Sequence, residues 1–226
     1  MSQKFIPMLF STLMVEALLN GTKTETRRKV KFPKDYDGKN VYPNGTLGLK
    51  YTSSDFEDCV KRLDPKVNVG DIIWVRETFQ ITDFLHPTDE NYGYIYKASE
   101  NGKEWQNNSE NWIWKPSLFM PKAACRIFLK CVSVHAERLQ EIDEQSAINE
   151  GIEKGIEIKQ NLKKEYCKIQ STYFKNYLSK EGLVKYAKES YMTLWQMIHG
   201  KNSWKENPYV WVYKFELIEK PIDFIK

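Results

Sequence analysis

Residues 21–28 read Gly-Thr-Lys-Thr-Glu-Thr-Arg-Arg, and they combine a helix stop with an amine, hydroxyl groups and two guanidinium groups. A lysine whose pKa is lowered can act as a general base, and a threonine hydroxyl can act as a nucleophile. Lys23 and Thr26 are therefore candidates for acid–base or nucleophilic chemistry, and Arg27 and Arg28 are candidates for binding an anion. An ordinary basic turn on the protein surface would have the same composition.

A short strand and an amphipathic helix precede this turn. Residues 6–10 read as the strand, and Ser11 or Thr12 can cap the helix. The apolar residues of the helix recur at helical spacing and are Leu13, Met14, Ala17 and Leu18. Gly21 stops the helix in the left-handed conformation that is usual just past a last turn, so residues 23–28 should leave a buried element in extended form.

A second helix end carries a carboxylate in an unfavourable place. Asp143 can cap a short helix that Gly151 stops, which puts Glu150 in the final turn. A negative charge there faces the negative pole of the helix and costs about 0.5 kcal/mol if it is exposed. Either a catalytic or binding role or a salt bridge to a lysine would explain the carboxylate.

Three further strands and one further helix are expected. Residues 72–79, 125–134 and 209–217 read as strands, because their apolar residues alternate or run together between turn signals. Residues 183–198 carry a helical apolar stripe that Gly200 ends. This mixture of elements indicates the α+β class.

Positive charge is concentrated in one part of the chain. The net charge is only +4, but residues 153–189 contain nine Lys against five Glu, with four Tyr between them. Such a segment could attract a phosphate backbone and stack bases. It could equally be a solvated helix surface whose tyrosines face the core.

The cysteines and histidines argue against a metal centre. The four cysteines form no CxxC pair and follow no secretory leader, which favours reduced thiols in a cytoplasmic protein. The three histidines are scattered, so neither a metal nor another cofactor is expected. No apolar run approaches the ~18 residues that a membrane helix needs, so we expect no membrane partner.

The spacing Gly21-x-Lys23-x-x-Thr26-x-Arg28 at a helix-to-strand junction resembles the signature of the ASCH domain, a small β-barrel related to the PUA fold. Three further blocks carry the resemblance, and they are Val69-Gly70-Asp71 with Trp74-Val75-Arg76-Glu77, Trp114-Lys115-Pro116-Ser117 with Met120-Pro121, and Asn207-Pro208 with Trp211-Val212. Together the blocks are similar to phage and prophage-type ASCH proteins. The resemblance implies a single α+β, PUA-like domain over residues 1–226, with flanking helices and with insertions at 79–111 and 153–180.

The resemblance also implies binding of a nucleoside or RNA beside the GxKxxTxR turn. Some small bacterial relatives resemble amidohydrolases that remove the acetyl group from N4-acetylcytidine, using a lysine, a threonine and a glutamate. Lys23 and Thr26 match the first two by motif position, and Glu150 is the best match to the third. A non-catalytic RNA- or DNA-binding phage factor and a ribonuclease are the alternatives.

Amide hydrolysis needs a nucleophile, a base and a proton for the leaving nitrogen. The Thr26 hydroxyl, or a water beside it, would attack the acyl carbonyl, and Lys23 would take the proton if burial lowers its pKa. Glu150 would then assist the departure of the leaving nitrogen. If instead Glu150 keeps Lys23 cationic, Lys23 would stabilise the oxyanion while the glutamate serves as base.

The remaining predicted site residues would bind the ligand. They are Gly21, Arg27, Arg28, Trp74, Arg76, Glu77 and Trp114. A guanidinium could pair with a phosphate or a base edge, or it could form ion pairs within the barrel. A tryptophan could stack on a pyrimidine or be a core ring.

Overall fold

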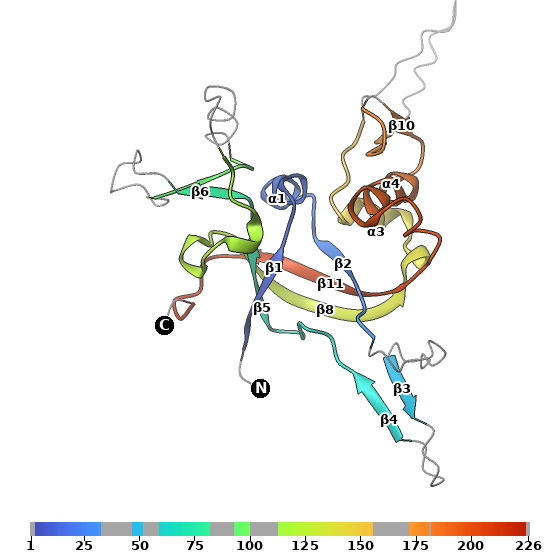
Figure 1. Cartoon of the computed structure of the whole chain (residues 1–226), viewed down its shortest axis with the longest axis horizontal. Helices are drawn as coiled ribbons and strands as arrows, with labels where there is room; N and C mark the ends of the chain where they lie inside the picture. The colour runs from blue at the N-terminus through green and yellow to red at the C-terminus, as the bar shows by residue number, and fades with distance from the viewer. Residues whose placement is uncertain are drawn as a thin grey trace, which may run out of the picture. The chain divides into compact units, whose positions relative to one another are not determined.

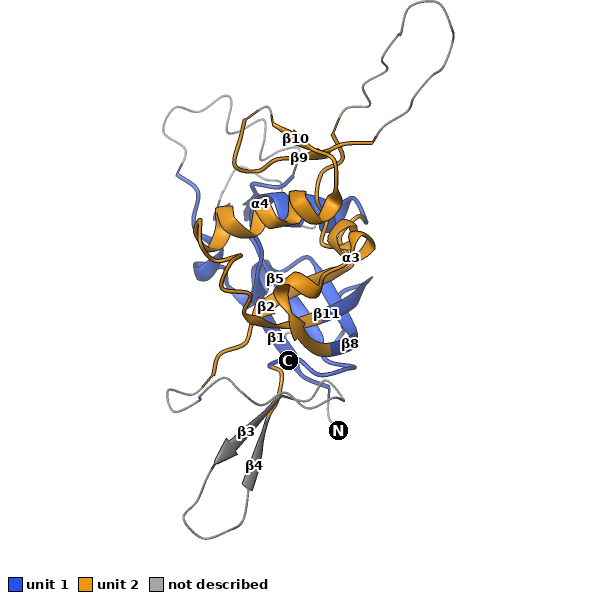
Figure 2. Ribbon diagram, turned by 90° about the vertical axis from the view of Figure 1, so that its right-hand side faces the viewer, with its two compact units in different colours: residues 1–21, 66–134, 213–226 blue, residues 22–65, 135–212 orange. Residues whose placement is uncertain are grey.

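The computed structural model describes seven stretches of the chain. These are residues 3–32, 47–51, 59–81, 93–99, 113–155, 172–180 and 182–224. The chain divides into two compact units (Figure 2). Unit 1 consists of residues 1–21, 66–134 and 213–226, and unit 2 consists of residues 22–65 and 135–212.

Five strands form the main sheet. They are β1 (Phe5–Leu9), β2 (Glu25–Lys29), β5 (Ile72–Arg76), β8 (Phe128–Arg138) and β11 (Tyr209–Ile218), in the order β1-β5-β8-β11-β2 (Figure 1). Strand β1 lies parallel to β5, and β5 lies antiparallel to β8 with Ile73 opposite Leu129. The boundary between the two units falls within β8 and within β11.

The α+β class is confirmed, whereas the described strands form no closed barrel. The order of the main sheet ends at β1 on one side and at β2 on the other. Three two-stranded sheets complete the described strands, and they pair β3 (Leu47–Tyr51) with β4 (Cys59–Leu63), β6 (Phe79–Ile81) with β7 (Tyr94–Tyr96), and β9 (Phe174–Lys175) with β10 (Leu183–Val184).

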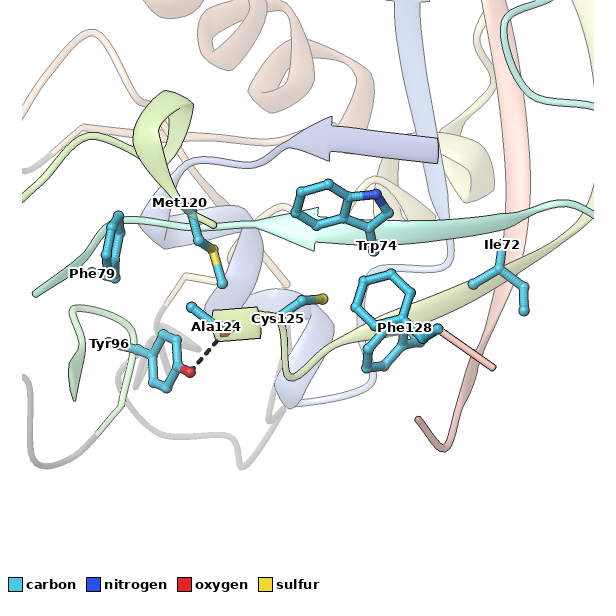
Figure 3. Close-up of a cluster of buried hydrophobic side chains, with 9 residues drawn as sticks. Ile72, Trp74, Phe79, Tyr96, Met120, Ala124, Cys125 and Phe128 are labelled. Atoms are coloured by element: carbon cyan, nitrogen blue, oxygen red, sulfur yellow. Dashed lines mark hydrogen bonds between the residues drawn. The ribbon is translucent and has the colours of Figure 1, made fainter. Parts of the chain in front are cut away.

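An apolar core fills unit 1. Strand β5 reads Ile-Ile-Trp-Val-Arg and buries its first four residues, as a continuous apolar run predicts. The cluster packed around it consists of Ile72, Trp74, Phe79, Tyr96, Met120, Ala124, Cys125, Phe128 and Phe224 (Figure 3). The rings of Phe128 and Phe224 meet edge to face with centroids 4.7 Å apart, which is a favoured aromatic geometry.

The helix before the GxKxxTxR turn is confirmed. Helix α1 (Thr12–Leu19) has Ser11 as its N-cap residue and buries one apolar face. Gly21 has a φ of +70°, and its N–H donates to the carbonyl oxygen of Leu18 at 3.1 Å. The glycine therefore ends the helix as expected, and the chain continues toward β2.

The helix end that carries Glu150 is also confirmed. Helix α3 (Glu144–Asn149) has Asp143 as its N-cap residue, and the carboxylate of Asp143 accepts a hydrogen bond from the Ser146 N–H at 2.6 Å. Gly151 follows the helix with a φ of +82°. Glu150 occupies the C-cap position between them.

Helix α4 (Ala187–His199) begins later than the helix predicted at residues 183–198. Leu183 and Val184, the first two residues of the predicted helix, instead form strand β10, which pairs with β9. The carboxylate of Glu144 accepts a hydrogen bond from the Ala187 N–H at 2.7 Å, so a residue of α3 caps the start of α4. The two helices pack against each other within unit 2 (Figure 2).

Strand β8 also differs from its prediction at residues 125–134. It covers Phe128–Arg138, so it begins three residues later and ends four residues later than predicted. A 3-10 turn, η2 (Lys122–Ala124), lies just before Cys125. Two further 3-10 turns are η1 (Ser117–Phe119) and η3 (Leu139–Glu141).

Much of both predicted insertions lies outside the described residues. The described part of residues 79–111 contains β6 and β7, and that of residues 153–180 contains β9. Residues 156–171 and 181 of the Lys- and Tyr-rich segment 153–189 lie outside the described residues. No helix among the described residues has the length and apolarity to cross a membrane.

Candidate active site

The segment that begins unit 2 lies against the end of helix α3. The Thr24 N–H donates to the carbonyl oxygen of Asn149 at 2.8 Å, and Lys23 forms an isolated β-bridge with Glu150. Lys23 Nζ donates to the backbone oxygen of Glu150 at 2.8 Å and to Oε2 of its carboxylate at 2.7 Å. The last carbonyls of a helix lack partners within it and attract a cation. The helix end thus brings the amine and the carboxylate to one point.

This pair is buried. Lys23 and Glu150 are each 3% exposed. A buried ion pair is stable only when its geometry is good and its remaining hydrogen-bonding atoms are satisfied. Arg27 supplies the second partner of the carboxylate, because its Nη1 lies 3.3 Å from Glu150 Oε1.

Arg27 lies among three carboxylates that come from three elements. Its Nε donates to Oε1 of Glu137 on β8 at 2.8 Å, and its Nη1 lies 3.5 Å from Oε2 of Glu25 on β2. The third carboxylate is that of Glu150. Side chains two residues apart on a strand share a face, which explains why Glu25 and Arg27 of β2 lie together.

Two further contacts extend this network. The Asn149 side-chain amide donates to Glu25 Oε1 at 3.1 Å, and His135 Nε2 lies 3.3 Å from Glu137 Oε2. The His135 side chain is 42% exposed, so the network runs from a partly exposed imidazole to the buried amine. Burial opposes ionisation of Glu137, but the hydrogen bond with His135 and the charge of Arg27 lower its pKa.

Burial lowers the pKa of Lys23 below its ordinary value of 10.5. Loss of hydration is the largest cause, and the negative charge of Glu150 opposes it. The positive charges of Arg28 and Arg27 lower the pKa further. The neutral amine is therefore easier to form here than in an exposed lysine.

Tyr191 of helix α4 faces the same carboxylate. Its burial raises its pKa well above 10.0, and the charge of Glu150 and a hydrogen bond with Glu150 add to this effect. Its phenol therefore stays protonated at neutral pH, beside the charges of Glu150 and Arg27.

Thr26 and Arg28 alternate with Glu25 and Arg27 along β2, so their side chains leave the strand on its other face. Thr26 is buried, and within the described stretches no hydrogen bond joins its hydroxyl to Lys23 or Glu150. Arg28 is half-buried, and its charge acts on Lys23. The structure therefore brings together the predicted amine and carboxylate but does not bond the predicted hydroxyl to them.

The other predicted ligand residues belong to unit 1. Trp74 is part of the apolar core, and the Arg76 guanidinium lies 5.5 Å from the centroid of its ring. Arg76 also donates to the backbone oxygen of Leu118. Trp114 is partly buried, and Gly21 is the exposed stop of α1.

Glu77 forms a closed ion pair within unit 1. Arg126 donates from Nε and Nη2 to its two carboxylate oxygens, each at 2.9 Å. The same guanidinium lies 4.1 Å from the ring centroid of Tyr96. Burial raises the pKa of Glu77, and Arg126 opposes that rise. Both carboxylate oxygens of Glu77 are thus already bound within unit 1.

Five residues of the network were not among the predicted site residues. They are Glu25, His135, Glu137, Asn149 and Tyr191. The alternation of Lys23, Glu25 and Arg27 is a signal that could have identified the first. Glu137 and Tyr191 lie far away in the chain and carry no local signal.

The described residues contain no group of three His, Cys, Asp or Glu side chains arranged to hold a metal ion. Comparison with known proteins adds no assignment: no protein-family model, curated protein or solved structure matches the chain.

Proposed function

We propose that the protein is an amidohydrolase that removes the acyl group from N4-acylated cytidine, as a nucleoside or within RNA. The observation that carries the proposal is the buried Lys23 amine, which lies 2.7 Å from the Glu150 carboxylate and has a lowered pKa. The substrate class comes from the resemblance of the GxKxxTxR turn to the ASCH domain.

The hydrogen bonds of Lys23 limit what its amine can do. A neutral amine has two N–H groups, and both would be donated to the backbone oxygen and Oε2 of Glu150. Its lone pair would then point away from Glu150 and could accept a proton. An ammonium group has three N–H groups, and the third would point the same way, where it could stabilise an oxyanion.

The lowered pKa makes the first of these two states easier to reach than it is in an exposed lysine. In that state Lys23 takes the proton of the nucleophile, which is the Thr26 hydroxyl or a water beside it. The new carbon–oxygen bond forms at the acyl carbonyl, the bond from that carbon to N4 breaks, and Lys23 returns the proton to N4. With water as the nucleophile the acid is released directly. With Thr26 as the nucleophile the acyl group stays on its hydroxyl oxygen as an ester, and a water that gives its proton to Lys23 then attacks that ester and releases the acid and Thr26. Glu150 orients the amine throughout, because both its oxygens already have cationic partners.

The proposal also assigns the chain the PUA-like fold of ASCH domains. Two observations support this assignment. The GxKxxTxR turn lies between helix α1 and strand β2, which is the junction where the motif is expected. The five-stranded mixed sheet supplies the strands from which such a barrel is built. On this assignment the partner is a nucleoside or RNA.

Incubation of the purified protein with N4-acetylcytidine, followed by chromatography, tests the activity. We expect release of cytidine and acetate, and a loss of about 100-fold or more in Lys23→Met, because a general base contributes that much. Thr26→Val separates the two nucleophiles, since loss of turnover indicates the hydroxyl and retained turnover indicates water.

Lys29→Met is the matched control, because it removes a lysine of β2 that is partly exposed and pairs with Glu206 at 3.1 Å. Circular dichroism establishes that each variant is folded. The proposal is wrong if the wild-type protein releases no cytidine while an ASCH-domain amidohydrolase does so under the same conditions. Equal activity of Lys23→Met and the wild type would refute the role of Lys23.

A further inference from the structure

Arg27 is enclosed by carboxylates instead of being open to a ligand. Its side chain is 2% exposed. Carboxylate oxygens of Glu25, Glu137 and Glu150 lie within 3.5 Å of its Nε or Nη1. A phosphate would have to displace one of them and add negative charge to a buried region that already holds three anions. The ligand-binding role expected for Arg27 does not fit this placement.

We infer that Arg27 is a positioning residue, which holds Oε1 of Glu150 so that Oε2 and the backbone oxygen of Glu150 orient the Lys23 amine. The inference rests on the proposed function of Lys23. Arg27 acts through Glu150, because its hydrogen bonds go to the three carboxylates and not to Lys23.

The geometry explains why two cations are needed. A carboxylate held through one oxygen can turn about its bond to the side chain, and an amine bound to its other oxygen would turn with it. Contacts from Lys23 at 2.7 Å and Arg27 at 3.3 Å fix both oxygens. Arg27 is itself anchored to β8 by the 2.8 Å hydrogen bond to Glu137. Lys23, Arg27 and, through Arg27, Glu137 thus fix the plane of the Glu150 carboxylate.

Charge links Arg27 to the protonation of Lys23 as well. The charged groups that act on Lys23 are Glu150, Arg28 and Arg27. Tyr191 faces Glu150 from α4, and Glu25, Glu137 and His135 complete the titratable groups of the network. Removing Arg27 takes away a positive charge near the amine and leaves Glu150 less neutralised. Both changes favour the protonated form of Lys23.

The decisive variant is Arg27→Gln. Protein with labelled lysine side chains is titrated by NMR, and the Lys23 signal is identified by its absence from the Lys23→Met spectrum. We expect the pKa of Lys23 to rise by about one unit in Arg27→Gln. The kcat for N4-acetylcytidine should fall about tenfold at any pH below the wild-type pKa of Lys23, since the neutral fraction falls by that factor there. The KM should stay within about twofold, because Arg27 does not contact substrate.

Two further variants serve as rescue and control. Arg27→Lys retains the positive charge but loses the planar fork, so it should restore the Lys23 pKa more completely than it restores kcat. Lys29→Gln removes a positive charge from the same strand at a side chain that is 39% exposed, and it should shift the Lys23 pKa less than Arg27→Gln does.

An unchanged Lys23 pKa in Arg27→Gln, or a rise in KM that exceeds the fall in kcat, would overturn the inference. If the wild type hydrolyses no acylcytidine, the proposed function fails, whereas the titration still tests whether Arg27 sets the state of Lys23. Should Arg27→Gln not fold, Glu137→Gln replaces it. Loss of that negative charge should lower the Lys23 pKa, and a rise would contradict our account.

Discussion

Glu77 in unit 1 and Glu150 in unit 2 are both buried carboxylates, but they are held in different ways. Glu77 places its two oxygens on one guanidinium, and that guanidinium stacks on Tyr96, whose hydroxyl donates to the Ala124 backbone (Figure 3). Glu150 places its two oxygens on two different cations, Lys23 and Arg27.

The two arrangements differ in whether the charge of the cation that binds the carboxylate can change. A bidentate arginine–carboxylate contact is complete, and arginine does not lose its proton in proteins. A carboxylate shared between a lysine and an arginine makes the charge of the lysine depend on the arginine, and lysine changes its pKa readily when it is buried. The divided carboxylate of unit 2 is therefore the one at which we propose the chemistry.

The largest effect expected from this comparison is on stability. Arg126→Met leaves Glu77, which is 1% exposed, without the only cation that acts on it among the described residues. We expect the free energy of unfolding to fall by about 3–5 kcal/mol. Lys23→Met should cost less, because Arg27 still neutralises Glu150. Urea unfolding of the two variants measures the difference.

Further variants test whether the loss of stability in each case comes from the carboxylate that is left behind. Glu77→Gln in the Arg126→Met background removes the orphaned charge and should recover part of the lost stability. An equal or larger cost for Lys23→Met would mean that Arg27 gives Glu150 no second support, and the contrast between the two carboxylates would be lost.

Local rules were sufficient to place the ends of the elements that carry the site. Gly21 and Gly151 adopt the positive φ expected of helix stops, and Asp143 caps its helix through a side-chain hydrogen bond. These positions put Lys23 and Glu150 each at the end of an element, whereas only the resemblance grouped the two residues in one site. Alternation along β2 was equally visible in the sequence, but it was not used to group Glu25 with Arg27.

The partners of Arg27 could not be predicted because they depend on tertiary packing. Glu137 and Glu150 lie 110 and 123 residues from Arg27 in the chain, and no periodicity links them. The start of α4 was missed for the same reason, since its cap is the carboxylate of Glu144. Closure of the sheet was inferred from the resemblance, and it stays a prediction.

A double-mutant cycle gives the next largest effect. Lys23→Met and Glu150→Gln, singly and together, should show a coupling energy of about 0.5–3 kcal/mol in urea unfolding, because the two groups share a hydrogen bond. Repeating the cycle in Arg27→Gln should change the coupling, since Arg27 holds the other oxygen. A coupling that is the same in both backgrounds would show that the two cations bind Glu150 independently.

The smallest effect is on the pH dependence of stability, and its sign differs between the two carboxylate regions. The pKa of Lys23 in the folded state is lowered below 10.5. Between that folded pKa and pH 10.5 the unfolded chain therefore binds more protons than the folded one, and stability should rise with pH. The pKa of Glu77 in the folded state is raised above 4.5. Between pH 4.5 and that folded pKa the folded state therefore binds more protons than the unfolded chain, and stability should fall as pH rises. Urea midpoints across pH for wild type, Lys23→Met and Glu77→Gln measure both windows. Each substitution should remove one slope and leave the other, and a difference from wild type that is constant across pH would contradict the assignment.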